Sequence, residues 1–240
     1  MASSGSWLFK WRSYLPLAVV AIIIPGLLNF SYPLNSHAYD LAYEMVCLFI
    51  SMFGLVIRCY TIGHVPSGTS GRNTKSQIAD SLNTTGIYSV VRNPLYLGNF
   101  FMMLGVVSFV RLWWADIVFC LLFCLYYERI IIAEETFLER KFGLEYLEYA
   151  RRTPAFFPRF KNWERPNLPF SFKNVLKREY SGFFAVILLM FLFEVVEDYV
   201  VEGELELDPV WVALMIFATV VYITLRTLKR HTKLLRVKGR

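Results

Sequence analysis

Six long apolar segments dominate this sequence and restrict what it can fold into. They cover residues 14–30, 41–57, 95–110, 112–127, 183–201 and 209–228. A helix that crosses a membrane needs roughly 17–25 mostly apolar residues, and these segments approach that length. The chain of 240 residues is 56% hydrophobic and 18% charged, which is too apolar for an ordinary soluble domain. We therefore predict an all-α, polytopic membrane helix bundle with about six spans.

The basic residues indicate which side of the membrane each loop faces. If the N-terminus lies inside and the spans alternate, every Lys and Arg except Arg111 falls on the inner side. The segment 194–208 holds seven acids and no base, and it falls on the outer side. We therefore expect a multi-pass protein with both termini in the cytoplasm. The first apolar segment lacks a small-residue cleavage site, so we interpret it as a retained span.

The charge balance argues against a nucleic acid partner, and the scattered Cys and His residues argue against a metal ion. The net charge of +6 is explained by a basic inner rim that meets anionic headgroups, so we expect no nucleic acid partner. The four Cys lie in or beside apolar segments, and the three His are far apart in sequence, so we predict no metal site. Glu44 is the one acid of its apolar segment, and we expect it to reach the outer interface.

A polar stretch, residues 84–98, separates two of the apolar segments. Pro94 disfavours the α conformation at Asn93 and suits the first position of a helix, so we predict a helix that starts at Pro94 with Asn93 as its cap. The free N–H groups at such a helix start attract anions. Gly98 and Gly105 lie on one face of this helix; we assign Gly105 to close packing and Gly98 to leaving space for a ligand.

The preceding loop, residues 61–83, is rich in Gly and polar residues. It is either a solvated connector or a flap that brings Arg72 or Lys75 to an anionic headgroup.

The fourth apolar segment continues without a helix breaker to Gly143, so we predict one long helix that leaves the membrane with Glu134 and Glu135 beyond it. Gly143 is expected to end this helix. A second short helix would then place Tyr146 and Tyr149 on one face.

Three sequence pieces together resemble the isoprenylcysteine carboxyl methyltransferase and phospholipid methyltransferase superfamily. They are Gly86-x-Tyr88 with Arg92-Asn93-Pro94-x-Tyr96-x-Gly98; Glu134-Glu135-x-x-Leu138; and Phe142-Gly143-x-x-Tyr146-x-x-Tyr149 with Arg152-Thr153-Pro154 and Phe157-Pro158. They occur in order over residues 84–160, about a third of the chain. The run Asn83-Thr84-Thr85-Gly86 is more similar to bacterial members of the lipid A 1-phosphate methyltransferase type, which implies a bacterial inner membrane.

The resemblance implies a membrane enzyme that uses S-adenosyl-L-methionine, has no Rossmann domain, and receives a lipid or lipidated acceptor from the bilayer. It divides the chain into a two-span scaffold with its loop (1–83), a catalytic core (84–160), and a basic linker with a two-span hairpin (161–240). The resemblance implies cofactor contacts from Asn93, Pro94, Tyr96, Gly98, Glu134 and Glu135. Tyr88, Tyr96, Tyr146 and Tyr149 supply aromatic faces for a sulfonium cation.

The catalytic candidates are Arg152, Arg92 and Glu135, with the arginines expected to orient an anionic acceptor through paired N–H donors. The superfamily usually has His where this chain has Asn93. Asn cannot carry a proton near neutral pH, which favours an acceptor that is already ionised, such as a phosphate or carboxylate. Lipid A 1-phosphate is the preferred acceptor, and an isoprenylcysteine carboxylate and a phosphatidylethanolamine amine remain open.

Two other classes compete with this interpretation. Membrane sterol and steroid reductases have a similar motif and bind NADPH, but they usually have more spans, and the Glu134-Glu135 helix favours the methyltransferase. A non-enzymatic membrane protein, such as a transporter, would place polar residues in mid-span, where this chain is almost entirely apolar.

Overall fold

The computed structural model describes residues 37–66, 68–69, 79–205, 207–237 and 239. The predicted first span (14–30) and the loop cations Arg72 and Lys75 lie outside these residues. Within the described part the fold is all-helical; its one β-bridge joins Gly86 to Glu164, and no Rossmann sheet is present there.

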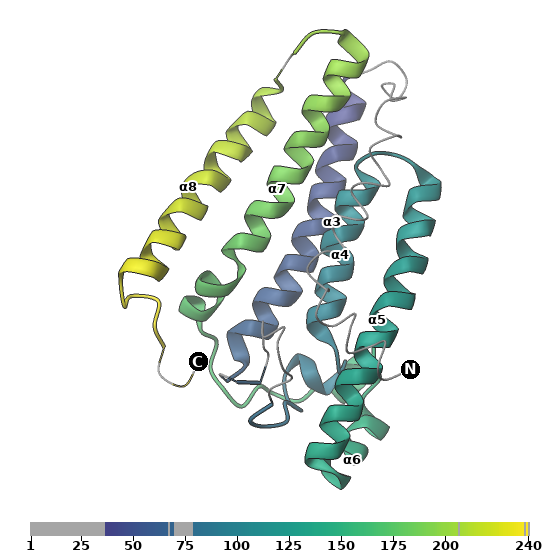
Figure 1. The fold of residues 1–240 in the computed structure, drawn as a ribbon, viewed down its shortest axis with the longest axis vertical. Coiled ribbons are helices and arrows are strands. Elements are labelled where there is room, and N and C mark those ends of the chain that lie inside the picture. The colour runs from purple at the N-terminus through teal and green to yellow at the C-terminus, as the bar shows by residue number, and fades with distance from the viewer. Residues whose placement is uncertain (1–36, 67, 70–78, 206, 238, 240) are drawn as a thin grey trace.

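Long helices lie side by side and form the body of the molecule (Figure 1). They are α3 (His37–His64), α4 (Pro94–Ser108), α5 (Trp113–Phe142), α7 (Phe172–Glu202) and α8 (Pro209–His231). A short helix, α6 (Leu144–Arg152), follows α5, and two 3₁₀ turns, η2 (Ile87–Ser89) and η3 (Phe160–Asn162), lie in the connections. Figure 1 shows α6 and the connections before α4 and α7 at one end of the bundle.

Each predicted apolar segment in the described part lies in one of these helices. Two helical segments, Tyr39–His64 and Pro209–His231, are long and apolar enough to cross a membrane, and α4 is a shorter apolar helix. These segments support a membrane protein, while the count of about six spans and the orientation of the termini stay predictions.

Helices α3 and α4 approach each other closely at small residues. A Cβ atom added to Gly105 would lie 2.3 Å from the Cys47 carbonyl oxygen, and one added to Gly54 would lie 2.4 Å from the Gly98 carbonyl oxygen. A Cβ on Gly98 would lie 2.5 Å from Cγ of Arg58. Helices that lack side-chain bulk at their contact bring their backbones together, which stabilises membrane bundles through van der Waals packing. The packing role expected for Gly105 is confirmed, and Gly98 has the same role.

Aromatic side chains join α5 to α4 and align the part of α5 that leads to the site. Phe119, Phe123 and Tyr127 follow one face of α5 and are buried, and Phe100 of α4 contacts both phenylalanines. The Phe123 and Tyr127 rings stack with centroids 4.1 Å apart. The helix then continues without a break, as predicted, and carries its last turns beyond the bundle (Figure 1).

Gly143 ends α5 and starts α6 in a backbone conformation with φ of 56°, a value that side-chain-bearing residues rarely adopt. The predicted break at Gly143 is therefore confirmed. Tyr146 and Tyr149 share the buried face of α6, also as predicted.

The other end of the bundle differs from the sequence-based expectation. Helix α7 extends to Glu202 and contains the predicted span 183–201, so Glu194, Glu197 and Asp198 lie in a helix, and all three are buried. Glu44 does not reach an interface: it is 0% exposed and accepts a hydrogen bond from Nε1 of Trp211 at 2.8 Å. Glu44 can stay buried because Trp211 of α8 donates a hydrogen bond to it, and the sequence around Glu44 does not reveal this distant donor.

Substitution of Gly105 by Ala tests the helix contact. The added methyl group would collide with the α3 backbone, so we expect an overpacking cost of about 1–3 kcal/mol and a lower Tm. Gly182→Ala is the matched control, because its nearest contact would be a flexible methionine methyl at 3.4 Å. Thermal unfolding of both variants in detergent measures the difference; equal Tm values would contradict the proposed packing.

Candidate functional site

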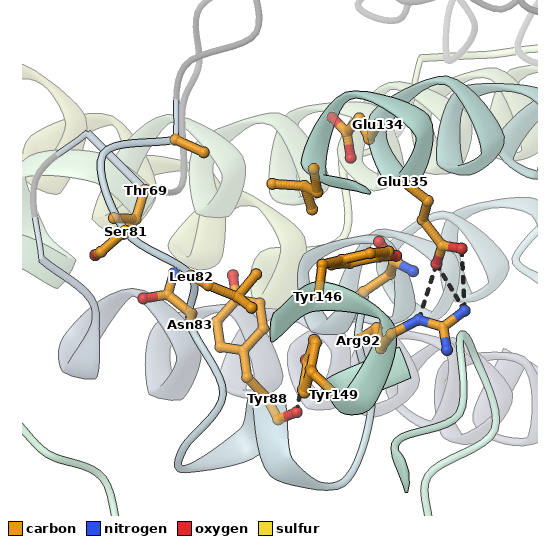
Figure 2. A pocket seen from close by; sticks show the side chains of 13 residues that line it. Thr69, Ser81, Leu82, Asn83, Tyr88, Arg92, Glu134, Glu135, Tyr146 and Tyr149 are labelled. Carbon is orange, nitrogen blue, oxygen red and sulfur yellow. Dashed lines mark hydrogen bonds and ion pairs between the residues drawn. The ribbon is translucent and has the colours of Figure 1, made fainter. Parts of the chain in front are cut away.

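An open cleft of about 440 Å³ lies at the end of the bundle where α4 begins and α6 packs. It is lined by Thr69, Ala79, Ser81, Leu82, Asn83, Tyr88, Arg92, Asn93, Glu134, Glu135, Leu138, Tyr146 and Tyr149. Figure 2 shows loop residues Ser81–Asn83 on one side and the Arg92 and Glu135 side chains on the other. Residues from all three sequence pieces therefore meet at one place.

Arg92 connects three segments that form the cleft wall. Its Nε and Nη2 donate to the two carboxylate oxygens of Glu135 at 2.9 and 3.0 Å, as the dashed lines in Figure 2 show. Its Nη1 donates to the carbonyl oxygens of Ala150 and Thr153, each at 2.8 Å. These carbonyls lie at the C-terminal end of α6, where a helix leaves acceptors unsatisfied and favours a cation. Arg92 thus fixes Glu135 and α6 together, and most of its donors are already used.

Glu134 is fixed by a different partner, Tyr96 of α4. The Tyr96 hydroxyl donates to Oε1 of Glu134 at 2.7 Å, and the Tyr96 ring packs on the Tyr127 ring with centroids 4.7 Å apart. The Tyr127 hydroxyl accepts from Asn99, which in turn accepts from Nη1 of Arg58 at 2.6 Å. Hydrogen bonds and one ring contact between Tyr127 and Tyr96 therefore connect the interior of the bundle to the carboxylate in the cleft.

Tyrosines form the apolar side of the cleft and stay protonated. Tyr146 and Tyr149 are 3% and 5% exposed, and the Tyr149 hydroxyl donates to the Tyr88 carbonyl oxygen at 2.8 Å. Burial raises the pKa of the Tyr88, Tyr146 and Tyr149 phenols well above the ordinary value for tyrosine. The Glu135 carboxylate raises the pKa of Tyr146 further. These phenols therefore donate hydrogen bonds at neutral pH and do not act as bases.

The Tyr146 hydroxyl is buried beside Glu135, and within the described part of the chain it has no hydrogen-bond partner of good geometry. A buried hydroxyl without a partner is costly, so this atom is a natural contact for a polar ligand.

The structure confirms the predicted position of Pro94 but gives the Asn93 side chain a different role from the predicted cap. Pro94 starts α4, as predicted, and Asn93 precedes it in the cleft wall. The Asn93 side chain does not cap the helix; its Nδ2 donates to the Ala155 carbonyl oxygen at 3.1 Å. Pro94 has no N–H, and the Tyr96 N–H donates to the Asn93 carbonyl oxygen, so the helix start offers fewer donors to an anion than expected.

Four of the candidates, Pro94, Tyr96, Gly98 and Arg152, lie outside the cleft lining. Gly98 faces α3, where Arg58 fills the adjacent space. Arg152 ends α6 with an exposed side chain, while its carbonyl oxygen accepts from Asn162.

Loop residues are the part of the lining that the sequence patterns did not single out. Thr69, Ala79, Ser81 and Leu82 contribute to the cleft from the segment that was expected to be a flap or a connector, beside Asn83, which the resemblance had already named. Their signal was weak, because the polar run that ends in Asn83 differs little from an ordinary turn.

The arrangement suits a ligand with a positive charge, hydroxyl groups and an aromatic ring. Two carboxylates held by Tyr96 and Arg92 accept hydrogen bonds, and tyrosine faces attract cations. The described lining holds no His, so proton transfer near neutral pH lacks its usual carrier there.

Comparisons with known proteins match this region. A profile of the family described as Phospholipid methyltransferase matches residues 45–145. The chain is 31% identical to the nickel-cobalt-cadmium resistance protein NccN of Alcaligenes xylosoxydans xylosoxydans, over 62% of this chain and 63% of that protein. It is 44% identical to the cobalt-zinc-cadmium resistance protein CzcN of Cupriavidus metallidurans, over 33% of this chain and 37% of that protein.

A eukaryotic relative matches a similar share of the chain. The protein-S-isoprenylcysteine O-methyltransferase of Saccharomyces cerevisiae is 29% identical over 60% of this chain and 59% of that protein. The chain thus spans less than two thirds of the length of these relatives. No solved structure gives a significant match. The matches support the phospholipid and isoprenylcysteine methyltransferase superfamily.

A double-mutant cycle tests the link between Arg92 and Glu135. Because both side chains are partly buried, Arg92→Met leaves a carboxylate without its partner, and we expect a loss of about 1–3 kcal/mol in stability. The double variant Arg92→Met, Glu135→Gln should recover part of this loss. Thermal unfolding of the four proteins measures the coupling, and strictly additive effects would show that the pair is not coupled.

Proposed function

We propose that this chain is an integral-membrane methyltransferase that uses S-adenosyl-L-methionine and acts on a lipid-borne acceptor. The observation that carries the proposal is that the three superfamily sequence pieces meet around one cleft, with Glu134, Glu135 and the tyrosines turned toward it. The profile match and the isoprenylcysteine methyltransferase relatives support the same reaction class.

The residues of the cleft fit this cofactor. Glu134 and Glu135 would accept hydrogen bonds from its ammonium group or ribose hydroxyls, and Tyr88, Tyr96 and Tyr149 would face its cationic sulfur or adenine. The buried Tyr146 hydroxyl would gain a partner. When bound, the cofactor supplies an electrophilic methyl group.

The protein's part in the reaction is to bind, align and exclude water. Arg92 acts as a positioning residue, because it holds Glu135 and the end of α6 and has few donors left for an acceptor. Methyl transfer to an anion neutralises charge, so a dry and aligned site contributes more than acid–base groups do. Arg152, exposed at the rim, is the arginine we propose for contact with an anionic acceptor.

We propose an anionic oxygen acceptor, with a lipid phosphate of the lipid A 1-phosphate type as the first choice. The supporting observation is that the described lining holds no His: Asn93 stands where the superfamily usually has His, and the phenols stay protonated. An isoprenylcysteine carboxylate satisfies the same requirement. A phosphatidylethanolamine amine must lose a proton before it can accept a methyl group, so it is the least suited of the three.

Binding of S-adenosylhomocysteine to the purified full chain tests the cofactor assignment. We expect Glu134→Gln and Glu135→Gln each to weaken binding on the order of tenfold, because each removes a charge-assisted hydrogen bond. Glu128→Gln is the matched control, since Glu128 is an exposed acid on the same helix. Calorimetry measures the affinities. Unchanged affinity in both cleft variants would reject the pocket, and a thermal shift with NADPH in place of S-adenosylhomocysteine would favour a reductase.

The pH dependence of labelled-methyl incorporation into membranes tests the acceptor class. A phosphate or carboxylate is already ionised at neutral pH, so the rate should stay level from about pH 7 to 9 and fall only when the pH drops through the acceptor pKa, about 6 or below. An amine, with a pKa of about 10, would instead give a rate that rises across this range. Mass spectrometry of the labelled lipid then identifies the acceptor, and a steady rise would contradict an anionic one.

A further inference from the structure

A buried cluster of carboxylates lies at the end of the bundle opposite the cleft. Asp40 and Glu44 are one turn apart on α3, and Glu194 faces them from α7. One carboxylate oxygen from each residue lies within 4.8 Å of those from the other two. The three side chains are 1%, 0% and 2% exposed. The cluster therefore joins two long helices through groups that normally require water or a cation.

The positive charge that contacts this cluster in the described part of the chain comes from Arg111, in the α4–α5 connection. Its Nη2 contacts Asp40 and lies 3.5 Å from Oε1 of Glu44, and its Nη1 lies 3.6 Å from Oε2 of Glu197. Glu197 and Asp198 are also buried there, at 0% and 3% exposure. Within the described part of the chain, one guanidinium therefore lies beside several buried carboxylates, and burial of an uncompensated charge costs several kcal/mol.

Several carboxylate oxygens of this cluster lack hydrogen bonds in the described part of the chain. Oε2 of Glu194 is fully buried and has no hydrogen-bond partner in the described part of the chain. Both carboxylate oxygens of Glu197 also lack hydrogen bonds there, although Arg111 is near one of them. Glu44, by contrast, uses one oxygen to accept from Trp211. Oε2 of Glu194 thus faces the cluster without a hydrogen bond in the described part of the chain, while the Glu194 carboxyl lies within hydrogen-bonding reach of Glu44.

We propose that Asp40, Glu44 and Glu194 bind a divalent cation that prefers oxygen ligands, with Ca²⁺ as the best fit. Such cations are held by carboxylate oxygens, whereas the softer transition metals favour imidazole or thiolate, which this trio does not offer. Two oxygens that share one Ca²⁺ at about 2.4 Å lie no more than about 4.8 Å apart, which agrees with the cluster. The cation ties α3 to α7 and supplies the charge that Arg111 leaves unbalanced. This site is independent of the proposed methyl-transfer cleft.

Trp211 provides an optical probe for this site. Its Nε1 donates to Glu44, so its indole lies next to the proposed cation and can transfer excitation to bound Tb³⁺, a luminescent substitute for Ca²⁺. In the purified full chain we expect Tb³⁺ emission on tryptophan excitation, displaced by added Ca²⁺. Trp211→Phe should remove most of the emission while Ca²⁺ still raises Tm. Emission that survives this substitution would place the bound ion elsewhere and overturn the proposal.

Glu194→Gln tests the ligand set directly. It should weaken Tb³⁺ and Ca²⁺ binding on the order of tenfold or more and remove the Ca²⁺-dependent rise in Tm. The variant should remain folded, because it removes one charge from an overcharged cluster, and its Tm without Ca²⁺ should exceed that of the original chain. Glu204→Gln is the matched control, since Glu204 is an exposed acid just beyond α7.

Two results would overturn the proposal. The first is a Tm that rises on acidification but not with Ca²⁺, Mg²⁺ or Mn²⁺, which would show that protons alone neutralise the carboxylates. The second is a Ca²⁺ response that Glu194→Gln leaves intact.

Discussion

The paired hydrogen bonds between Arg92 and Glu135 hold the cleft together. Arg92 belongs to the connection before α4, Glu135 to the extended part of α5, and the carbonyls of Ala150 and Thr153 to the end of α6. One planar guanidinium with several donors in a fixed geometry serves all of them, which Lys could not do. The walls of the cleft are therefore held by hydrogen bonds from one side chain to a carboxylate and to backbone carbonyls, together with the packing of the buried tyrosines.

The two ends of the bundle treat charge differently. Near the cleft, three acids each have a dedicated partner: Arg92 for the partly buried Glu135, Tyr96 for the partly buried Glu134, and Arg58 for the buried Glu179, whose carboxylate accepts from Arg58 at 2.7 and 2.9 Å. Such pairs position side chains without a net excess of charge. At the far end, carboxylates from α3 and α7 gather around the guanidinium of Arg111 within the described part of the chain. The pairs near the cleft therefore hold individual side chains in place beside the proposed ligand site. The cluster at the far end instead requires a positive charge to compensate its carboxylates.

Local sequence rules predicted the features that local geometry decides. Pro94 starts α4, Gly143 separates α5 from α6, and the helical spacing of Tyr146 and Tyr149 places both on one buried face. The features that depend on distant partners were not predictable in this way. Glu44 was expected at an interface because its hydrogen-bond donor, Trp211, lies 167 residues away. Gly98 was assigned to a ligand because nothing in its segment reveals that Arg58 fills the adjacent space.

The buried carboxylates of α7 also bear on how the chain enters the membrane. Helix α7 is not among the described helices that are apolar enough to cross by composition alone. An acid such as Asp opposes insertion of an isolated helix by up to about 2.5–3.5 kcal/mol at its centre. Arg111, whose Nη1 lies 3.6 Å from Oε2 of Glu197, precedes α7 in the chain and is synthesised first. The order of elements therefore places this cation ahead of the buried carboxylate of α7 that it contacts.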